Sequence, residues 1–375
     1  MKLIFKRDAL INVLNIVSKA VSSKTTMPIL ECILIEACED GVYFTANDME
    51  LGIRTHLSLE DCKIETGGRL ALEAKLFSDI VRKITADENS EIELYSDGTI
   101  VKITSGNSVF KIQEKDPDQF PAFPSVNEET YISISQFTLK EVIRDTIFSI
   151  SPNDSNKMMT GELFEVNENR LRVASLDGHR ISIRTTELKE TYPSVKVIIP
   201  GKTLNEISKI ITGDTEKKVD IFFSSNYVLF KFDETIMVSR LIDGEYFKID
   251  SMLSSDYETR VTINKREFLD CIERSTILIR ETDKKPLILD IHDGKMSLKI
   301  NSIIGSMNAE LEIRKQGKDL MIAFNPRFLL DALRVIDDEE VKLYLTNPKA
   351  PCFIRDDQEN YIYLILPVNF NPEAY

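Results

Sequence analysis

The sequence predicts an α+β protein built from three copies of one domain. Apolar residues recur at a spacing of 129 residues, for example from Leu3 to Ile132 and Val261. In each copy they first lie two apart, as on a strand, and then three to four apart, as on a helix. A shift of 67 residues from Phe5 reaches Leu72, where the same change of period is repeated. The chain therefore contains six strand-helix units, two in each domain.

The helices are expected where the apolar period is helical. They are predicted over residues 6–19, 75–84, 137–146, 202–211, 264–274 and 327–336. Between them, alternating segments such as 91–95, 219–223 and 341–345 are typical of strands. Turn signals such as Asp97-Gly98 and Asp293-Gly294 separate these segments. There is one helix for every three or four strands in each unit.

The repeat is too long for a solenoid, whose period is about 20 to 50 residues, and instead matches the size of a whole domain. Two segments read as connectors: 116–124, with three prolines, and 250–258. The predicted domains are domain I at 1–126, domain II at 127–254 and domain III at 255–375.

The charge of the chain is unevenly distributed. The net charge is −14, which by itself argues against nucleic-acid binding. The six helix segments, however, hold 15 Lys or Arg against 9 Asp or Glu, a net charge of +6. Such segregation lets an acidic protein present a basic face. The alternative interpretation is that solvated helix faces are simply rich in charge, and charge alone does not decide between them.

The composition excludes several other classes of protein. Five cysteines without a Cys-x-x-Cys pair indicate reduced thiols, and three histidines, one in each domain, do not suggest a metal site. No apolar run approaches the ~18 residues of a membrane span, and Met1-Lys2 leads directly into the first strand. We therefore expect a cytoplasmic protein with no cofactor, no metal and no membrane partner.

Two aspartates recur at the repeat spacing. Asp48 and Asp177 each follow a strand, which predicts a turn residue whose side chain caps backbone amides. Only the second is followed by Gly178-His179-Arg180. An enzyme hypothesis would make His179 a base oriented by Asp177. No nucleophile elbow, phosphate loop or zinc motif accompanies it, so catalysis is the weaker interpretation.

The last apolar segment predicts a strand that ends at a proline. Residues 363–366 suit a strand that closes the third sheet, and Pro367 ends it. An apolar end exposed in this way could also dock a peptide. From the residues alone, the closing strand is the favoured interpretation.

Three motifs carry a resemblance to a known family. They are Met27-Pro28-Ile29-Leu30, the stretch 175–181 (Ser-Leu-Asp-Gly-His-Arg-Ile) and the ending Leu366-Pro367-Val368. Together with the threefold repeat, they closely resemble the bacterial DNA polymerase III beta subunit, the sliding clamp, from Met1 to Phe370. The resemblance implies a head-to-tail homodimer that closes a ring around duplex DNA. In each domain, two helices would lie inside and line the hole, and antiparallel sheets would lie outside.

The resemblance also implies a function and partners. The protein would be a non-catalytic processivity factor that slides on double-stranded DNA independently of sequence. Its partners would be the DNA polymerase III alpha subunit, the clamp loader, and other DNA polymerases and repair proteins that carry clamp-binding peptides. A small-molecule enzyme using the Gly-His-Arg turn, or a repeat-built adaptor that never encircles DNA, remain the alternatives.

The resemblance assigns residues to a peptide pocket between domains II and III. By matching positions it would be lined by Met159, Leu176, Gly178, His179, Arg180, Ile181, Phe247, Met252, Asn325, Phe328, Pro351, Leu364, Leu366 and Pro367. Leu176 replaces a common threonine, Phe247 a usual proline, and Asn156-Lys157 a frequent Arg-Pro. The rim of the pocket could therefore favour a different peptide residue.

Two further surfaces are implied. At the dimer interface, Phe110 and Ile112 of one subunit would face Ile277 and Leu278 of the other. Lys24 and Asn153 match positions that contact DNA in the family. To these we add three cations at equivalent places in the repeats, namely Lys75, Lys202 and Arg327.

Overall fold

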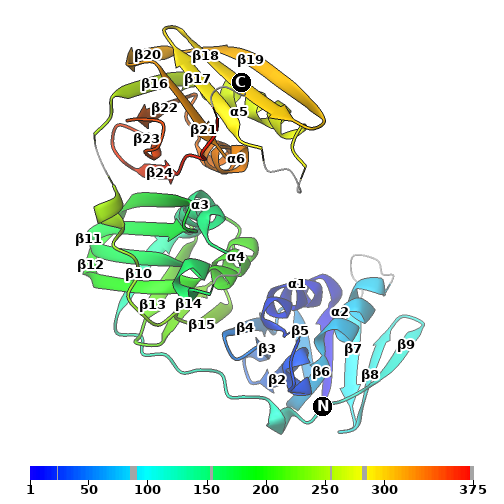
Figure 1. Ribbon diagram of the computed structural model, residues 1–375. Coiled ribbons are helices and arrows are strands. Elements are labelled where there is room, and N and C mark those ends of the chain that lie inside the picture. Colours follow the sequence, from blue (N-terminus) through cyan, green and yellow to red (C-terminus); the bar gives the residue numbers. More distant parts are fainter. Residues whose placement is uncertain (23, 85–90, 153–154, 254–255, 281–284, 372–375) are drawn as a thin grey trace. The chain divides into compact units, whose positions relative to one another are not determined.

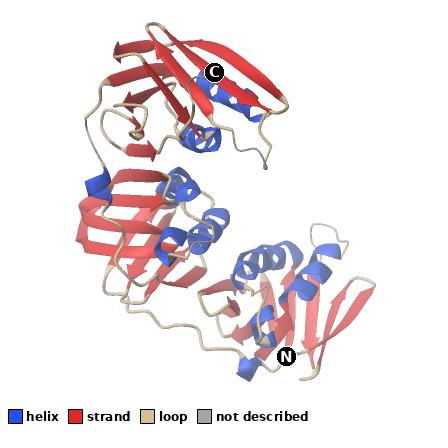
Figure 2. Cartoon of the chain, viewed as in Figure 1, coloured by secondary structure: helices blue, strands red, loops and turns tan. Residues whose placement is uncertain are grey.

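The computed structural model describes residues 1–375 except 23, 85–90, 153–154, 254–255, 281–284 and 372–375. Every ladder between the described strands is antiparallel. Helices and strands are both abundant, as Figure 2 shows. The predicted α+β class with antiparallel sheets is confirmed.

The six predicted helices are present, each within two residues of its expected limits. They are α1 (Arg7–Val17), α2 (Ala74–Lys83), α3 (Gln136–Thr146), α4 (Gly201–Ile210), α5 (Lys265–Thr276) and α6 (Pro326–Val335), labelled in Figure 1. Helices α1 to α5 each begin at the residue after a strand ends, and Asn325 alone separates α6 from β21 (Leu320–Phe324). The six strand-helix units are therefore confirmed. Asn264 and Asn325 cap α5 and α6 by accepting backbone N–H groups.

The chain forms two units, of which the first comprises 1–139 and 206–241. It has a five-stranded sheet in the order β5 (Cys62–Thr66), β1 (Lys2–Lys6), β7 (Glu91–Ser96), β8 (Ile100–Ser105), β9 (Ser108–Gln113). Its eight-stranded sheet runs β10 (Tyr131–Ser135), β13 (Lys218–Phe223), β14 (Tyr227–Phe232), β15 (Thr235–Arg240), β4 (Leu51–Ser58), β3 (Gly41–Asn47), β2 (Cys32–Cys38), β6 (Gly68–Glu73). Helices α1 and α2 contact each other, and their apolar stripes, including Leu10, Leu14 and Phe77, are buried.

The eight-stranded sheet crosses a predicted domain limit, since β4 pairs with β15. The seam is reinforced by side chains, because the hydroxyls of Thr55 and Thr235 lie 2.9 Å apart and both residues are buried. Phe123, from the proline-rich connector, lies against Gly52 of β4, where a Cβ atom would come within 3.0 Å of its ring. The connector therefore packs on the sheet of this unit.

The second unit comprises 140–205 and 242–375. Its seven-stranded sheet runs β11 (Gly161–Leu176), β12 (Arg180–Pro200), β24 (Tyr361–Ile365), β23 (Cys352–Arg355), β22 (Glu340–Leu345), β16 (Thr259–Asn264), β20 (Arg314–Gly317). Its four-stranded sheet runs β19 (Gly305–Glu312), β18 (Lys295–Ser302), β17 (Leu287–His292), β21 (Leu320–Phe324). Helices α5 and α6 contact each other and bury Phe268 and Leu329 in a core shared with strands of both sheets.

Candidate functional site

Strand pairing assembles the apolar floor of the predicted peptide site. In the ladder of β11, β12 and β24, Ile181 is paired with Leu176 on one side and Leu364 on the other. All three side chains are buried in one apolar cluster, against which Met159 and Phe247 pack as partly buried residues. Five residues assigned through the resemblance therefore lie together in the second unit.

A tight turn joins β11 to β12 beside this floor. Asp177 Oδ1 accepts the backbone N–H groups of His179, at 3.0 Å, and Arg180, at 3.1 Å. Gly178 has a φ of 82°, a left-handed conformation that glycine adopts at little cost. The turn thus needs aspartate for its amides and glycine for its backbone.

The equivalent turn of the first domain is built in the same way. Asp48 Oδ1 accepts the backbone N–H groups of Glu50, at 3.1 Å, and Leu51, at 2.7 Å. The prediction that both aspartates cap backbone amides is confirmed. The Asp177 carboxylate is directed to the backbone and to Arg180, and among the described contacts none joins it to the ring of His179. The enzyme hypothesis therefore lacks its orienting contact.

Arg180 connects three elements around the site. Its Nε donates to Asp177 Oδ2 at 3.0 Å, its Nη1 to Asp331 Oδ2 on α6 at 2.5 Å, and its Nη2 to the carbonyl of Phe148. The guanidinium also lies 4.5 Å from the centroid of the Phe328 ring, a cation–π distance. Only 10% of the side chain is exposed. Arg180 therefore positions Phe328 and the turn from within the protein.

His179 and the end of the chain form the outer part of the site. The His179 ring stacks on Phe328 with centroids 6.0 Å apart and planes 21° apart. Its carbonyl accepts the backbone N–H of Leu366 at 2.9 Å, which holds the segment after β24 beside the turn. Leu366 is 38% exposed and is followed by Pro367. An apolar side chain and a stacked ring pair therefore face solvent next to the buried floor.

Three further predicted residues are Asn325, Met252 and Pro351. Asn325 caps α6 and accepts the backbone N–H of Arg327 at 3.1 Å. Met252 ends a short 3₁₀ helix at Ile249–Met252 and is 44% exposed, and Pro351 immediately precedes β23. Among the described contacts, no hydrogen bond or ring contact joins Met252 or Pro351 to the other site residues.

Sequence reasoning missed two residues that shape the site. Phe148 supplies the carbonyl that Arg180 binds, and Asp331 supplies the carboxylate. Asp331 had a signal in the sequence, since it follows Phe328 by three residues and so lies on the same helix face. Phe148 had none, because a backbone carbonyl is available at any residue.

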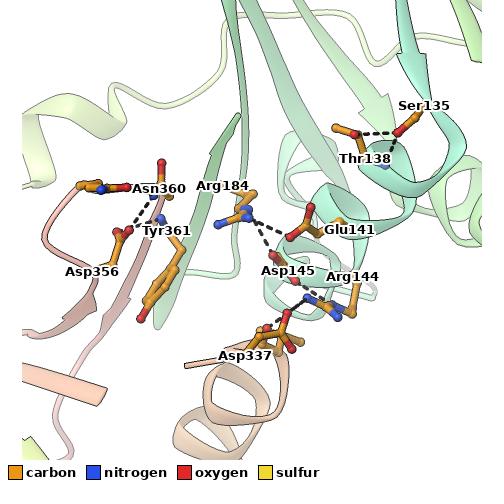
Figure 3. Close-up of polar contacts among 12 residues, drawn as sticks. Ser135, Thr138, Glu141, Arg144, Asp145, Arg184, Asp337, Asp356, Asn360 and Tyr361 are labelled. Atoms are coloured by element: carbon orange, nitrogen blue, oxygen red, sulfur yellow. Dashed lines mark hydrogen bonds and ion pairs between the residues drawn. The ribbon is translucent and has the colours of Figure 1, made fainter. Parts of the chain in front are cut away.

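An ion-pair network lies on the same strand. Alternation along β12 places Ile181 and Ile183 in the apolar cluster and Arg180 and Arg184 on the opposite face. Figure 3 shows Arg184, which contacts Glu141 at 2.8 Å and Asp145 at 3.3 Å on α3. This face of β12 is therefore polar and charged.

The network extends from α3 to the segment after α6. Arg144 contacts Asp145 at 2.8 Å and Asp337 at 2.9 Å (Figure 3). Burial raises the pKa of Asp145 to about 6, against the opposing effect of Arg144 and Arg184. The network thus joins the middle part of the sequence to the C-terminal part through a buried carboxyl group.

Three predicted DNA contacts share one structural position. Lys75, Lys202 and Arg327 are each the second residue of a helix, α2, α4 and α6, and each is exposed. A cation in the first turn of a helix is unfavourable, because that end carries a partial positive charge. Their placement is therefore not explained by helix stability. Lys24 is exposed in a loop, and Asn153 lies outside the described residues.

The predicted dimer residues lie at or near sheet edges. Phe110 and Ile112 belong to β9, the edge strand of the five-stranded sheet, where Phe110 is 37% exposed. Ile277, just after α5, is 76% exposed, and Leu278 packs partly against the core. Each unit thus presents an apolar surface, with β19 as an edge strand of the four-stranded sheet in the second unit.

The fold and the site together indicate a peptide-binding protein built from repeated strand-helix units. Strand-helix units are repeated, and the best-defined candidate site is an apolar surface with ordered polar neighbours, suited to binding a peptide. Among the described residues there is no helix that could span a membrane and no group of three or more side chains placed to hold a metal ion.

Comparison with known proteins identifies the family. Models of the DNA polymerase III beta subunit match the chain in order: the N-terminal domain at 1–124, the central domain at 133–248 and the C-terminal domain at 250–369. The beta sliding clamp of Bacillus subtilis is 34% identical over 381 residues, which covers 98% of this chain and 99% of the relative. The chain belongs to the DNA polymerase III beta subunit family, the beta sliding clamps. This family is non-catalytic.

Solved structures agree with this assignment. A DNA polymerase III beta subunit from Eubacterium rectale superimposes with a TM-score of 0.94 at 58% identity, covering 99% of this chain and all of the other. The DNA polymerase sliding clamp of Bacillus subtilis gives a TM-score of 0.95 at 33% identity with the same coverage.

Proposed function

We propose that this protein is a processivity factor for a replicative DNA polymerase. The observation that carries the proposal is the match of all three family domains, in order, along nearly the whole chain. A processivity factor works by keeping the polymerase at high effective concentration near its primer, even when the grip of the enzyme lapses. No chemical step is required of the clamp itself.

The proposed assembly is a ring-shaped head-to-tail homodimer around duplex DNA. A heterologous contact that closes after two copies makes a ring, and the apolar surfaces at β9 and after α5 are suited to form it. A closed ring holds DNA topologically, so its direct contacts can be weak and independent of sequence. Exposed cations such as Lys75, Lys202 and Arg327 would supply these contacts.

The proposed peptide site is the surface formed by β11, β12, β24 and α6. Its buried apolar floor and partly exposed Leu366 suit an apolar side chain of a linear motif. Candidate partners are the polymerase alpha subunit, the clamp loader, and other polymerases and repair proteins. Action on replicating DNA implies a cytoplasmic location. The three proposed domains are 1–126, 127–254 and 255–375.

The test is particle-averaged electron microscopy together with the mass in solution. We expect a ring with a central hole, at twice the chain mass of 42.8 kDa. A compact monomer that still binds peptides would contradict the ring-shaped homodimer and favour the adaptor hypothesis. Retention on circular DNA, with release when the DNA is linearised, provides a second readout of topological binding.

A further inference from the structure

A hollow in the surface is lined in part by the chain segment that leaves the proposed peptide site. It has a volume of about 750 Å³ and lies between β21, the loop before β23 and the end of the chain. Its apolar lining comes from Leu320, Met321, Pro348, Val368 and Phe370. We call this hollow the tail groove. Nothing in the peptide site described above uses it.

The tail groove and the peptide site share one wall. The backbone N–H of Leu366 donates to the carbonyl of His179 at 2.9 Å, within the peptide site. Two residues later, the backbone N–H of Val368 donates to the carbonyl of Ala323 in β21 at 2.8 Å. The chain therefore runs from the peptide site at Leu366 to the groove lining at Val368 within two residues.

The charges around the tail groove are mostly neutralised. Lys318 pairs with Glu258 at 2.7 Å, and Asp319 contacts both Lys315 and His292. Lys349 is exposed and has no ion pair among the described residues. An unneutralised cation therefore stands beside an apolar hollow, on a protein whose net charge is −14.

We propose that the tail groove binds the segment of a partner peptide that flanks its clamp-binding motif. This segment would place an apolar side chain against Met321 and Phe370 and an acidic side chain near Lys349. The proposal rests on the proposed peptide site, with which the groove is continuous. Since the net charge of the protein is −14, a cation without an ion pair, such as Lys349, gives an acidic flank a favourable position beside the groove.

The experiment uses fluorescein-labelled synthetic peptides and the full-length protein. One peptide carries the linear motif alone. The others extend it, at either end, by four residues that contain one leucine and either two glutamates or two lysines. We expect the acidic extension at one end to tighten binding about fivefold in low salt, and the lysine extension to give no gain. Fluorescence anisotropy measures the affinities.

The variants separate the groove from the peptide site. Lys349→Glu should abolish the gain from the acidic flank while leaving the affinity for the motif alone unchanged. Lys189→Glu, the same charge change at an exposed lysine outside the groove, should leave the gain intact.

Two outcomes would overturn the proposal in different ways. Equal affinity for the short and extended peptides, or an equal gain in Lys349→Glu, would eliminate the groove while leaving the peptide site in place. Failure of the motif peptide itself to bind would remove the peptide site, and the groove with it.

Discussion

Arg180 illustrates, at the scale of single residues, how a group assigned to ligand binding can act through its neighbours. Three of its nitrogen atoms donate to protein acceptors, and its guanidinium lies over Phe328. Arg180 was predicted to line the peptide pocket. In the structure its guanidinium is paired with Asp177 and Asp331, so we expect it to affect a bound peptide through the Phe328 ring and the turn.

Asp331 should therefore influence peptide binding without touching the peptide. Asp331→Ala removes one charge-assisted hydrogen bond from Arg180 and frees the guanidinium to leave Phe328. We expect the affinity for a motif peptide to fall about tenfold, and Asp331→Asn to lose less because it keeps an acceptor. Fluorescence anisotropy measures the change.

A matched control exists in the first domain. Asp79 of α2 occupies the position equivalent to Asp331 in the repeat, because Phe77 corresponds to Leu329. Asp79→Ala should leave peptide affinity unchanged. If Asp331→Ala lowers only the melting temperature, and not the affinity, Arg180 has no positioning role.

The buried carboxyl group of Asp145 makes a prediction about pH. Burial raises the pKa of Asp145 from its ordinary 3.8 to about 6 in the folded protein. Between these values the folded state holds a proton that the unfolded state has released, so the contribution of Asp145 to stability is lost as pH rises from about 4 to 6. The free energy of unfolding can fall by at most about 3 kcal/mol through this group, because its pKa is raised by about two pKa units.

Comparison with Asp145→Asn isolates this effect, because the variant cannot titrate at that position. Melting temperatures of both proteins should be recorded across pH 4 to 7. The wild type should lose stability relative to the variant as pH rises to 6, and the difference should then be constant. A difference that does not change with pH would mean that Arg144 and Arg184 hold the carboxylate ionised throughout.

At the scale of elements, three helices carry cations where the helix itself disfavours them. Lys75, Lys202 and Arg327 each occupy the second position of a helix. The repeat thus preserves a charge that costs the helix about 0.3–1 kcal/mol when exposed. Such a cost is consistent with a role in binding an anion such as the DNA backbone.

Reversing these three charges should have opposite effects on stability and DNA binding. Changing Lys75, Lys202 and Arg327 to glutamate should leave the melting temperature unchanged or slightly higher, because anions are favoured at helix N-termini. Association with DNA should weaken, and its dependence on salt should become less steep as phosphate contacts are lost. Binding measured over a series of salt concentrations tests both points.

The control is a second triple variant, in which three exposed lysines on strands are changed to glutamate and the net charge changes by the same amount. Glutamate at Lys63, Lys196 and Lys295 should leave the salt slope near that of the wild type. If both triple variants have the same slope, the helices are not the DNA contact.

At the scale of the whole molecule, exposed apolar residues at and near strand edges are the surfaces that we expect dimerisation to bury. The edge strand β9 exposes Val109 and Phe110, and the end of α5 exposes Ile277. An exposed apolar edge invites pairing with another chain. In the proposed dimer, the edge of one subunit would meet the corresponding surface of the other.

Phe110→Asp should therefore break the dimer while leaving the fold intact, because the side chain is already partly exposed. We expect the mass in solution to fall from twice 42.8 kDa to a single chain, measured by light scattering. Tyr95→Asp, on the interior strand β7 of the same sheet and 45% exposed, should remain dimeric. A dimeric Phe110→Asp variant would move the interface elsewhere.

The sequence determined the local architecture of this protein. The positions of the six helices and of the strands that precede them followed from apolar periods, because the periodicity of a helix or strand is a property of neighbouring residues. The Asp48 and Asp177 turns were predictable for the same reason, since each aspartate bonds to backbone amides two or three residues away. The resemblance to sliding clamps then supplied candidate residues for the peptide site.

The tertiary structure alone decided which distant residues meet. The pairing of Ile181 with Leu364, the bond from Arg180 to Asp331 and the pairing of β4 with β15 join segments far apart in the chain. Local pattern contains no information on strand order, since a strand with one buried face can pair with many others. The floor of the peptide site, the support of Phe328 and the tail groove therefore became visible only in the folded chain.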